Sequence, residues 1–552
     1  MDEQIREHER AVRALEGQMK EHDGTVWALE EQIREHKRAT IKLRRARNSL
    51  LDVSKLPPEI LGDIFHRNVS PRSDFGGLEK RSHNFLCVCH HWYEVASGTP
   101  ELWSFWGNTL QDWARWCRRS GTGPLDLVLK DDEYYCGNSD AIVRNTLRDH
   151  AAADRIRRVH LTSVNSEFLS SIIASLTVKC DEVRSNSMES FVLWGHDERG
   201  VVGLSDFFAR YRFPKLRRLD LTCTASAWDH INSRTGALID LDVEFAEPEP
   251  GPTTSQLLSA LTSNPLLQRL VLYSRAIPND GGGESSFRVP LHHLKQLTLL
   301  GNSRDVIRLL HRLDHPARLD RLSLTLYHWT VVEISQVIGP CFRDYLRGRG
   351  TSQNGLGLSL SSDDMIILDT GDARGIGPPL RQVNTFMTVA LGYNEALSRD
   401  VRENVILELI SHAPQEEIVY FQTHGNFVAM GNVYTKFPNL TTLSLAKIPL
   451  SSAFPKPNPG EDEGILRSLR YVSLRELVVD DGDWSPLATF LARHASSRNR
   501  LDMLEISYSP HMYSEVMESI SGVVRELEIE HVSGRARARR LIGFGRSRYS
   551  RV

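Results

Sequence analysis

Residues 86–92 read LCVCHHW, which places two cysteines and two histidines within five positions. Thiolate sulfur and imidazole nitrogen are common zinc ligands, so Cys87, Cys89, His90 and His91 are the first candidates for chemistry. A structural zinc site needs four ligands, and no second CxxC or HxxxH pair follows nearby. The seven cysteines of the chain are irregularly spaced and do not indicate a disulfide framework. We therefore expect no metal site and no cofactor here.

The element that positions these residues is predicted to be a helix over residues 85–96. At 3.6-residue spacing, Val88, Cys89 and Trp92 share its apolar face. Cys87 and His91 are four residues apart and would be neighbours on the outer face, together with His90. Helical spacing thus divides the apparent metal cluster between two sides of one helix.

A second amphipathic helix is predicted just upstream. Leu56-Pro57-Pro58-Glu59 is a helix-start signal, because proline is tolerated in the first turn and an acidic residue suits the positive end of the helix dipole. The apolar residues that follow are expected to form a single stripe; they are Ile60, Leu61, Ile64 and Phe65.

The two helices together resemble an F-box, in particular the variants that are abundant in fungi. LPPEILGDIF at 56–65 and VCHHWYEVASGTPELW at 88–103 carry the family's Leu-Pro start, paired apolar residues, Val-Cys-x-x-Trp phrase and Pro-x-Leu-Trp end. The insertion between the halves is longer than in the compact form of the family. The alternative is a small helical subdomain that packs only on its own chain.

The resemblance implies an all-helical module over residues 52–106 that docks on the Skp-type adaptor of an SCF (Skp–cullin–F-box) ubiquitin ligase. It implies two sets of residues. The adaptor-binding set is Leu56, Pro57, Pro58, Glu59, Ile60, Leu61, Ile64 and Phe65. The F-box core set is Val88, Cys89, Trp92, Leu102 and Trp103.

Residues 1–50 have the heptad pattern of a coiled coil and are rich in helix-forming Glu, Arg, Lys, Gln and Ala. The a positions are Ile5, Val12, Met19, Val26 and Ile33, and Leu15 and Leu29 occupy d positions. QIREH at 4–8 returns as QMKEH at 18–22 and QIREH at 32–36, which leaves histidine at alternate d positions: His8, His22 and His36.

Three structures fit this segment. It can pair as a coiled coil whose polar d residues fix the register, and so form a homodimer. It can remain a lone helix, which Asp23 and Gly24 favour. Its histidines can also stack as a pH switch or metal site. We predict that any self-association of residues 1–50 weakens below about pH 6, because protonated imidazoles repel each other.

From about residue 120 onward the phrase Leu-x-x-Leu-x-Leu recurs, mostly every 22 to 34 residues. Alternating apolar residues suit a strand with one buried face, and helical stretches such as TTSQLLSALTSNP, DVIRLLHRL and WSPLATFLARHA lie between copies. A strand plus a helix at this period is typical of leucine-rich repeats. The copies are LRRLDL (216–221), LIDLDV (238–243), LQRLVL (267–272), LKQLTL (294–299), LDRLSL (319–324), LTTLSL (440–445), LRELVV (474–479), LDMLEI (501–506), VRELEI (524–529) and a degenerate IRRVHL (156–161).

The predicted fold class is therefore α/β: a helical coiled coil (1–50), an F-box-like domain (52–106) and an irregular leucine-rich-repeat-like solenoid (107–531). An ordinary α/β domain is the alternative for the solenoid. Residues 340–415 interrupt the rhythm, with one strand expected at LGLSLS (356–361) and one helix at NVILELISHAP. Seven arginines in the last 18 residues predict a basic disordered tail (532–552), or alternatively a nuclear-targeting or acidic-partner patch.

The composition excludes several classes of protein. The formal net charge of −3 over 552 residues gives no reason to expect nucleic acid as a partner. The charged N-terminus and the lack of long apolar runs predict a cytoplasmic or nuclear protein without a membrane span. We find no GxxxxGK[ST], HExxH, GxSxG or GxGxxG phrase, and the acidic DDGD at 480–483 is expected to be a solvated loop. We predict no catalytic residues and no enzyme.

The expected function is that of a substrate receptor in an SCF-type ubiquitin ligase, with the F-box binding the adaptor and the repeats binding an unknown protein target. The first alternative is a protein-binding scaffold of the same fold that never joins a ligase. The second is a metal- or redox-responsive protein that acts through Cys87, His91 and the histidines of the coil.

Overall fold

The structure is a computed structural model of the 552-residue chain. It describes residues 2–69, 83–107, 117–131, 155–163, 166–177, 184–185, 187–195, 204–222, 235, 237–245, 251–280, 288–314, 319–349, 356–361, 365–372, 384–392, 399–424, 430–454, 466, 468–479, 483–496, 501–507, 520, 523–533 and 536–543. Within these ranges the chain forms two units: Met1–Leu129 with Gly137–Arg157, and Lys130–Cys136 with Arg158–Val552.

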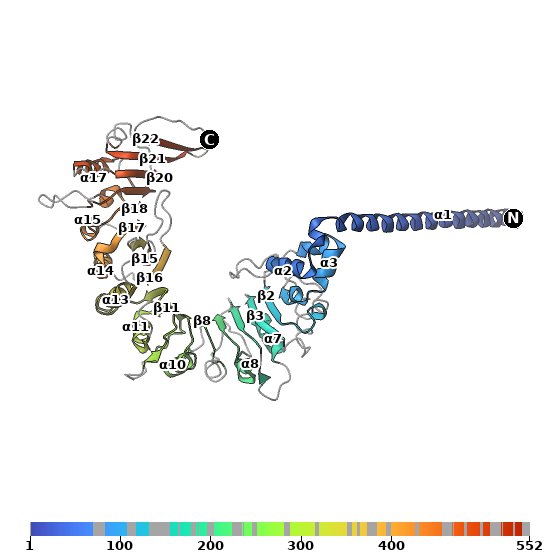
Figure 1. The fold of residues 1–552 in the computed structure, drawn as a ribbon, viewed down its shortest axis with the longest axis horizontal. Coiled ribbons are helices and arrows are strands. Elements are labelled where there is room, and N and C mark those ends of the chain that lie inside the picture. Colours follow the sequence, from blue (N-terminus) through green and yellow to red (C-terminus); the bar gives the residue numbers. More distant parts are fainter. Residues whose placement is uncertain are drawn as a thin grey trace. The chain divides into compact units, whose positions relative to one another are not determined.

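The first unit begins with helices and ends in two short strands (Figure 1). Strand β1 pairs in parallel with the start of β2, with Phe105 opposite Asp126. The elements are α1 (Asp2–Ser49), η1 (Asp52–Lys55), α2 (Pro58–Val69), η3 (His83–Cys87), α3 (His90–Ser97), η4 (Pro100–Trp103), β1 (Phe105–Gly107) and β2 (Leu125–Asp131).

Helix α1 runs without a break through Gly17 and Gly24, as the helix-forming composition predicts. At 1.5 Å per residue it is about 72 Å long. Several large apolar side chains on it are exposed to solvent, including Val26, Leu29 and Ile33 from the heptad pattern. The helix is confirmed, whereas pairing of α1 with a second copy stays a prediction.

A small apolar core holds α2, η3, α3 and η4 together. Phe65 of α2 stacks on Phe85 of η3 with 4.6 Å between ring centroids, and the Trp92 ring lies 5.1 Å from Phe65. The indole N–H of Trp103 donates to the carbonyl oxygen of Ala96 at 2.7 Å, so its buried polar atom is satisfied. The buried members are Leu61, Phe65, Phe85, Val95, Ala96, Leu102 and Trp103, and Leu56, Leu86 and Trp92 pack on them partly buried.

The second unit is built mainly from parallel strands that pair with their successors along the chain. The first series is β3 (Ile156–Ser163), β5 (Ser190–Gly195), β7 (Arg218–Thr222), β8 (Asp240–Phe245), β9 (Arg269–Ser274), β11 (Gln296–Asn302) and β13 (Arg321–Tyr327). The second series is β14 (Leu356–Ser361), β17 (Ile418–His424), β18 (Thr442–Ala446), β19 (Tyr471–Arg475), β20 (Leu501–Ser507) and β21 (Val524–Ser533).

The two series meet through β15 (Met365–Asp372) and β16 (Asn384–Gly392). Strand β16 is parallel to β13, and β15 lies between β14 and β16 and is antiparallel to both. Only three residues, 362–364, separate β14 from β15, fewer than one turn of an α-helix. The mixed α/β class is confirmed. The sheet is not the irregular solenoid of one strand and one helix per repeat that the sequence predicted.

Helices connect many of the strands, and in Figure 1 α7, α8, α10 and α11 lie along one side of their strands. The three helical stretches predicted from the sequence are confirmed as α10, α11 and α17, and NVILELISHAP lies largely in α14. The helices are α7 (Ser166–Leu176), α8 (Leu204–Arg210), α10 (Thr254–Thr262), α11 (Ser303–Arg312), α12 (Val331–Glu333), the π-turn η5 (Ile334–Ile338), α13 (Gly339–Arg349), α14 (Arg399–His412), η6 (Gln415–Glu417), α15 (Met430–Tyr434), α16 (Leu450–Ala453) and α17 (Ser485–Ser496).

Most copies of the repeated phrase coincide with a strand, and their leucines are buried. LRELVV at 474–479 is the exception, because β19 ends at Arg475. The buried leucines that accompany this strand are Leu469, which precedes it, and Leu474, which lies within it. Four further short strands form two separate parallel pairs: β4 (Arg184–Ser185) with β6 (Tyr211–Arg212), and β10 (Val289–Pro290) with β12 (Leu313–Asp314).

The predicted basic tail is not wholly disordered. Its residues Ala536–Gly543 form β22, which pairs antiparallel with β21 at the end of the sheet. An edge strand offers unpaired backbone groups, and the returning chain satisfies them. Residues 544–552 lie outside the described residues. None of the described helices has a stretch long and apolar enough to cross a lipid bilayer.

Candidate functional site

Helix α2 begins where the sequence predicted. Pro58 is its first residue, Glu59 lies in the first turn, and the N–H of Leu61 donates to the carbonyl oxygen of Pro57 at 3.1 Å. Proline loses nothing at this position, because the first N–H groups of a helix have no partner within the helix. The start of α2 thus follows from local chemistry.

The four apolar residues of α2 form two stripes rather than the single stripe that the sequence predicted. Leu61 and Phe65 are buried in the helical core. Ile60 and Ile64 lie one residue earlier, about 100° around the helix, and their exposed fractions are 48% and 39%. Of the remaining predicted adaptor-binding residues, Leu56 is partly buried against the core, whereas Pro57, Pro58 and Glu59 are exposed.

Three of the five residues that the resemblance implied as F-box core lie in or against the helical core, namely Trp92, Leu102 and Trp103. Leu102 and Trp103 are fully buried, and Trp92 and Cys89 are partly buried. Val88 is not part of this core, since 54% of its surface is exposed. The prediction fails there because Val88 precedes the helix: α3 begins only at His90, so helical periodicity does not extend back to residue 88.

The predicted continuous helix over residues 85–96 is also wrong, and this changes the geometry of LCVCHHW. Cys89 has extended backbone angles (φ −159°, ψ 169°) and caps α3, its Sγ accepting from the N–H of Trp92 at 3.5 Å. Cys87 ends η3 and His91 lies in α3, so the two residues are not neighbours on one helix. Among the residues that the structure describes, no group of three His, Cys, Asp or Glu side chains could hold a metal ion.

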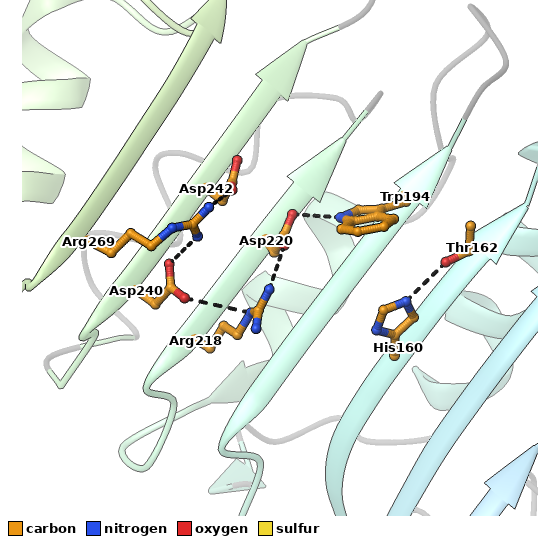
Figure 2. A network of polar contacts seen from close by, with 8 residues as sticks. All are labelled: His160, Thr162, Trp194, Arg218, Asp220, Asp240, Asp242 and Arg269. Carbon is orange, nitrogen blue, oxygen red and sulfur yellow. Dashed lines mark hydrogen bonds and ion pairs between the residues drawn. The ribbon is translucent and has the colours of Figure 1, made fainter. Parts of the chain in front are cut away.

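A charged surface on the second unit was not found from the sequence. Strands β3, β5, β7, β8 and β9 pair in register, so the side chains on their common open face form rows. We call the central part of this face the charged face (Figure 2). Its residues are His160, Thr162, Trp194, Arg218, Asp220, Asp240, Asp242, Glu244, Arg269 and Tyr273.

Two arginines on this face bridge three aspartates. Arg269 contacts Asp240 at 2.7 Å and Asp242 at 2.6 Å, one carboxylate for each terminal nitrogen. Arg218 donates to Asp220 at 3.1 Å, and its Nε lies 3.8 Å from an Asp240 oxygen. Charge-assisted bonds of this kind fix the register of side chains across three strands.

Aromatic and imidazole rings extend the network toward β3. The indole N–H of Trp194 donates to Asp220 at 2.8 Å, and the Trp194 ring lies 5.5 Å from the ring of buried His160. His160 Nε2 and Thr162 Oγ1 are 3.1 Å apart. Trp194 is nevertheless 38% exposed, so part of this side chain stays open to solvent.

The carboxylates are held in an environment that disfavours their charge. Val192 and Val271, which are buried, flank Asp220 and Asp242 in the same row of the sheet. Burial raises the pKa of Asp220, and burial together with the charges of Asp220 and Asp240 raises the pKa of Asp242 to about 6. The pKa of Tyr273 is also raised, first by burial and then by the nearby carboxylates.

No protein-family model matches the chain, and no curated protein is similar to it at a significant level. The sequence could have indicated the charged face only through the polar positions between the leucines. RLDL, DLDV and RLVL each carry an arginine or an aspartate there. Their convergence depends on strand register, which a single sequence does not reveal.

Proposed function

We propose that the chain is a substrate-receptor subunit of an SCF-type ubiquitin ligase that docks on a Skp-type adaptor through α2 and binds a protein target on its sheet. It would act by proximity, holding a target near a transferase that it does not itself contain. This role is that of an intracellular protein in the cytoplasm or nucleus, and it requires no cofactor and no catalytic residue of its own.

The observation that carries the proposal is the outward stripe of α2. Ile60 and Ile64 lie four residues apart and are exposed, while Leu61 and Phe65 beside them anchor the helix. Burying two half-exposed isoleucines in a partner would contribute on the order of 1 kcal/mol each. An amphipathic helix that offers apolar residues at i and i+4 is a common mode of protein recognition.

The resemblance of residues 52–106 to an F-box supports the same reading. Leu56-Pro57 precedes α2, and Trp92, Leu102 and Trp103 pack in or against one core. We further propose that the second unit is an irregular leucine-rich-repeat-like array, since its parallel strands bury the leucines of the repeated phrase. Its open face is then the surface for the target.

The proposal is tested by size exclusion with a purified Skp-type adaptor. The wild-type chain should co-elute with the adaptor, and Ile60→Asp/Ile64→Asp should not, because two charges would enter an apolar contact. Val331→Asp/Val332→Asp is the matched control: it makes the same change at exposed valines of α12 and should co-elute. If the wild type elutes separately from the adaptor, docking through α2 is overturned and the first alternative, a scaffold outside any ligase, is favoured.

Dimerisation through residues 1–50 is part of the proposal, because Val26, Leu29 and Ile33 are exposed at heptad spacing. Sedimentation should detect a dimer that Val26→Asp/Ile33→Asp converts to a monomer. A metal- or redox-responsive role through Cys87 and His91 is favoured instead if the purified chain contains stoichiometric zinc.

A further inference from the structure

The charged face lies in the second unit, and two aromatic side chains, Trp194 and Tyr273, flank Glu244 in its outer row. Trp194 of β5, Glu244 of β8 and Tyr273 of β9 belong to one register row, with β7 between β5 and β8. Neighbouring strands are about 4.8 Å apart, so three strand spacings separate the two aromatic positions by about 14 Å. That width accommodates a long side chain lying between them.

The Trp194 ring on β5 is held in place by neighbouring side chains. The hydrogen bond from the Trp194 indole to Asp220 fixes the ring, and contact with His160 supports it from the side of β3 (Figure 2). A fixed, partly exposed tryptophan loses little entropy on binding, and tryptophan is enriched at the centre of protein interfaces. Tyr273 is half-buried at the opposite side of the row.

The charges between the aromatics do not balance. Asp220, Asp240, Asp242 and Glu244 are four carboxylates, whereas Arg218 and Arg269 are two guanidinium groups, which leaves −2 when all six are ionised. Both arginines are already shared between two aspartates. Among the described residues, Glu244 forms no ion pair. A set of ion pairs that served only to join strands would need no more carboxylates than guanidinium groups.

The excess negative charge lies where burial raises the free-energy cost of ionising the carboxylates. Asp220 is 3% exposed, and Val192 and Val271 exclude water from the row that it shares with Asp242. A cation from a partner would relieve the repulsion between these carboxylates, and the low local polarity would strengthen its attraction to them. A phosphate or acidic group of a partner would be repelled by the same carboxylates.

We propose that the charged face binds an extended segment of the target protein by taking one arginine or lysine side chain between Trp194 and Tyr273, against Asp242 and Glu244. The aromatic faces attract the cation, and the carboxylates accept its N–H groups. The inference rests on the proposed role of the sheet as the target surface. It does not depend on adaptor binding through α2.

The test uses the immobilised full-length chain and a random nonapeptide library with a fixed central position of Arg, Lys, Glu or Leu. The wild type should retain the Arg and Lys sub-libraries about fivefold more than the Leu sub-library, as about 1 kcal/mol of cation binding implies. It should retain the Glu sub-library least. Equal retention of all four sub-libraries would overturn the inference.

Variants localise the binding. Glu244→Gln removes a charge that forms no ion pair among the described residues, so the fold should persist. Trp194→Ala removes the indole ring at one side of the proposed binding position. Each should reduce the preference for Arg and Lys to less than about twofold. Glu526→Gln, an exposed carboxylate on β21, is the matched control and should keep the full preference. An unchanged preference in both Glu244→Gln and Trp194→Ala, with native circular dichroism, would contradict the inference.

Adaptor co-elution measured on the same preparations separates the two proposals. Glu244→Gln and Trp194→Ala should still co-elute with the adaptor. A wild type that co-elutes with the adaptor but retains all four sub-libraries equally would overturn only the inference about the charged face. A wild type that prefers the Arg and Lys sub-libraries but does not co-elute with the adaptor would overturn only the proposed docking through α2.

Discussion

Helix α2 and the charged face are exposed surfaces of opposite chemistry. On α2, Ile60 and Ile64 stay in water although residues beside them are buried. On the charged face, Asp220 and Asp242 are largely removed from water although they are ionisable. In each case a group lies in an environment that costs free energy in the isolated chain, and a partner would reduce that cost.

The two surfaces differ in how their geometry is held. The outward stripe of α2 depends on a small apolar core, so it is lost if that core opens. The charged face depends on strand register and on ion pairs that span β7, β8 and β9. Changes that break one support should therefore leave the other intact.

The largest expected effect is on the core below α2. Phe65→Ala removes a fully buried ring that stacks on Phe85 and should cost about 3–5 kcal/mol locally. Ile60→Ala/Ile64→Ala should cost less than about 1 kcal/mol, because both side chains face solvent. Hydrogen exchange of α2 and α3 measures this difference. Equal losses of protection would mean that both stripes are structural.

The next effect concerns the arginine that joins β8 and β9. Arg269→Met leaves Asp240 and Asp242 without their shared partner and should destabilise the second unit by about 2 kcal/mol, since the site is only partly buried. Glu244→Gln on the same face should change stability by less than about 0.5 kcal/mol. Urea unfolding of the full chain compares the two variants. Similar midpoints would show that the ion pairs contribute little to the free energy of unfolding.

A smaller effect follows from the titration of Asp242. Its pKa in the folded chain is about 6, above the ordinary value of 3.8, so the folded state holds the proton more tightly than the unfolded state. By linkage, the stability that Asp242 contributes is greatest at low pH and is lost as pH rises toward and through 6. The groups that face it are Arg218 and Asp220 of β7, Asp240 and Glu244 of β8, and Arg269 and Tyr273 of β9.

Asp242→Asn should therefore gain stability relative to the wild type by about 1 kcal/mol between pH 5 and pH 8. Melting temperatures of both proteins across this range measure the gain. Asp206→Asn, at an exposed carboxyl on α8 outside the charged face, is the control for general effects of pH. A constant difference between Asp242→Asn and the wild type from pH 5 to pH 8 would contradict the raised pKa.

The strands of the second unit could be predicted because each buries its leucines on one face, a property of single segments. The antiparallel β15 could not, since nothing in the repeated phrase marks a reversal of direction. For α2, the spacing identified an apolar helix but not its inward face. Leu61 rather than Ile60 faces the core because of where α3 and η4 pack, which is a tertiary fact.

The charged face was missed for a related reason. Asp220 and Asp242 are 22 residues apart in the sequence and become neighbours only through the register of β7 and β8. Trp194 lies in FVLWG, an apolar run without the repeated phrase. Local rules also failed at Val88, because the cap formed by Cys89 shifts the start of α3 to His90.

Hydrogen exchange of the full chain with and without the Skp-type adaptor tests the central proposal most directly. Docking on Ile60 and Ile64 should slow exchange of the amides in Pro58–Val69 by about tenfold or more, while the amides of β5 to β9 keep their rates. A complex in which Pro58–Val69 exchanges at the rate of the free chain would contradict adaptor binding through α2.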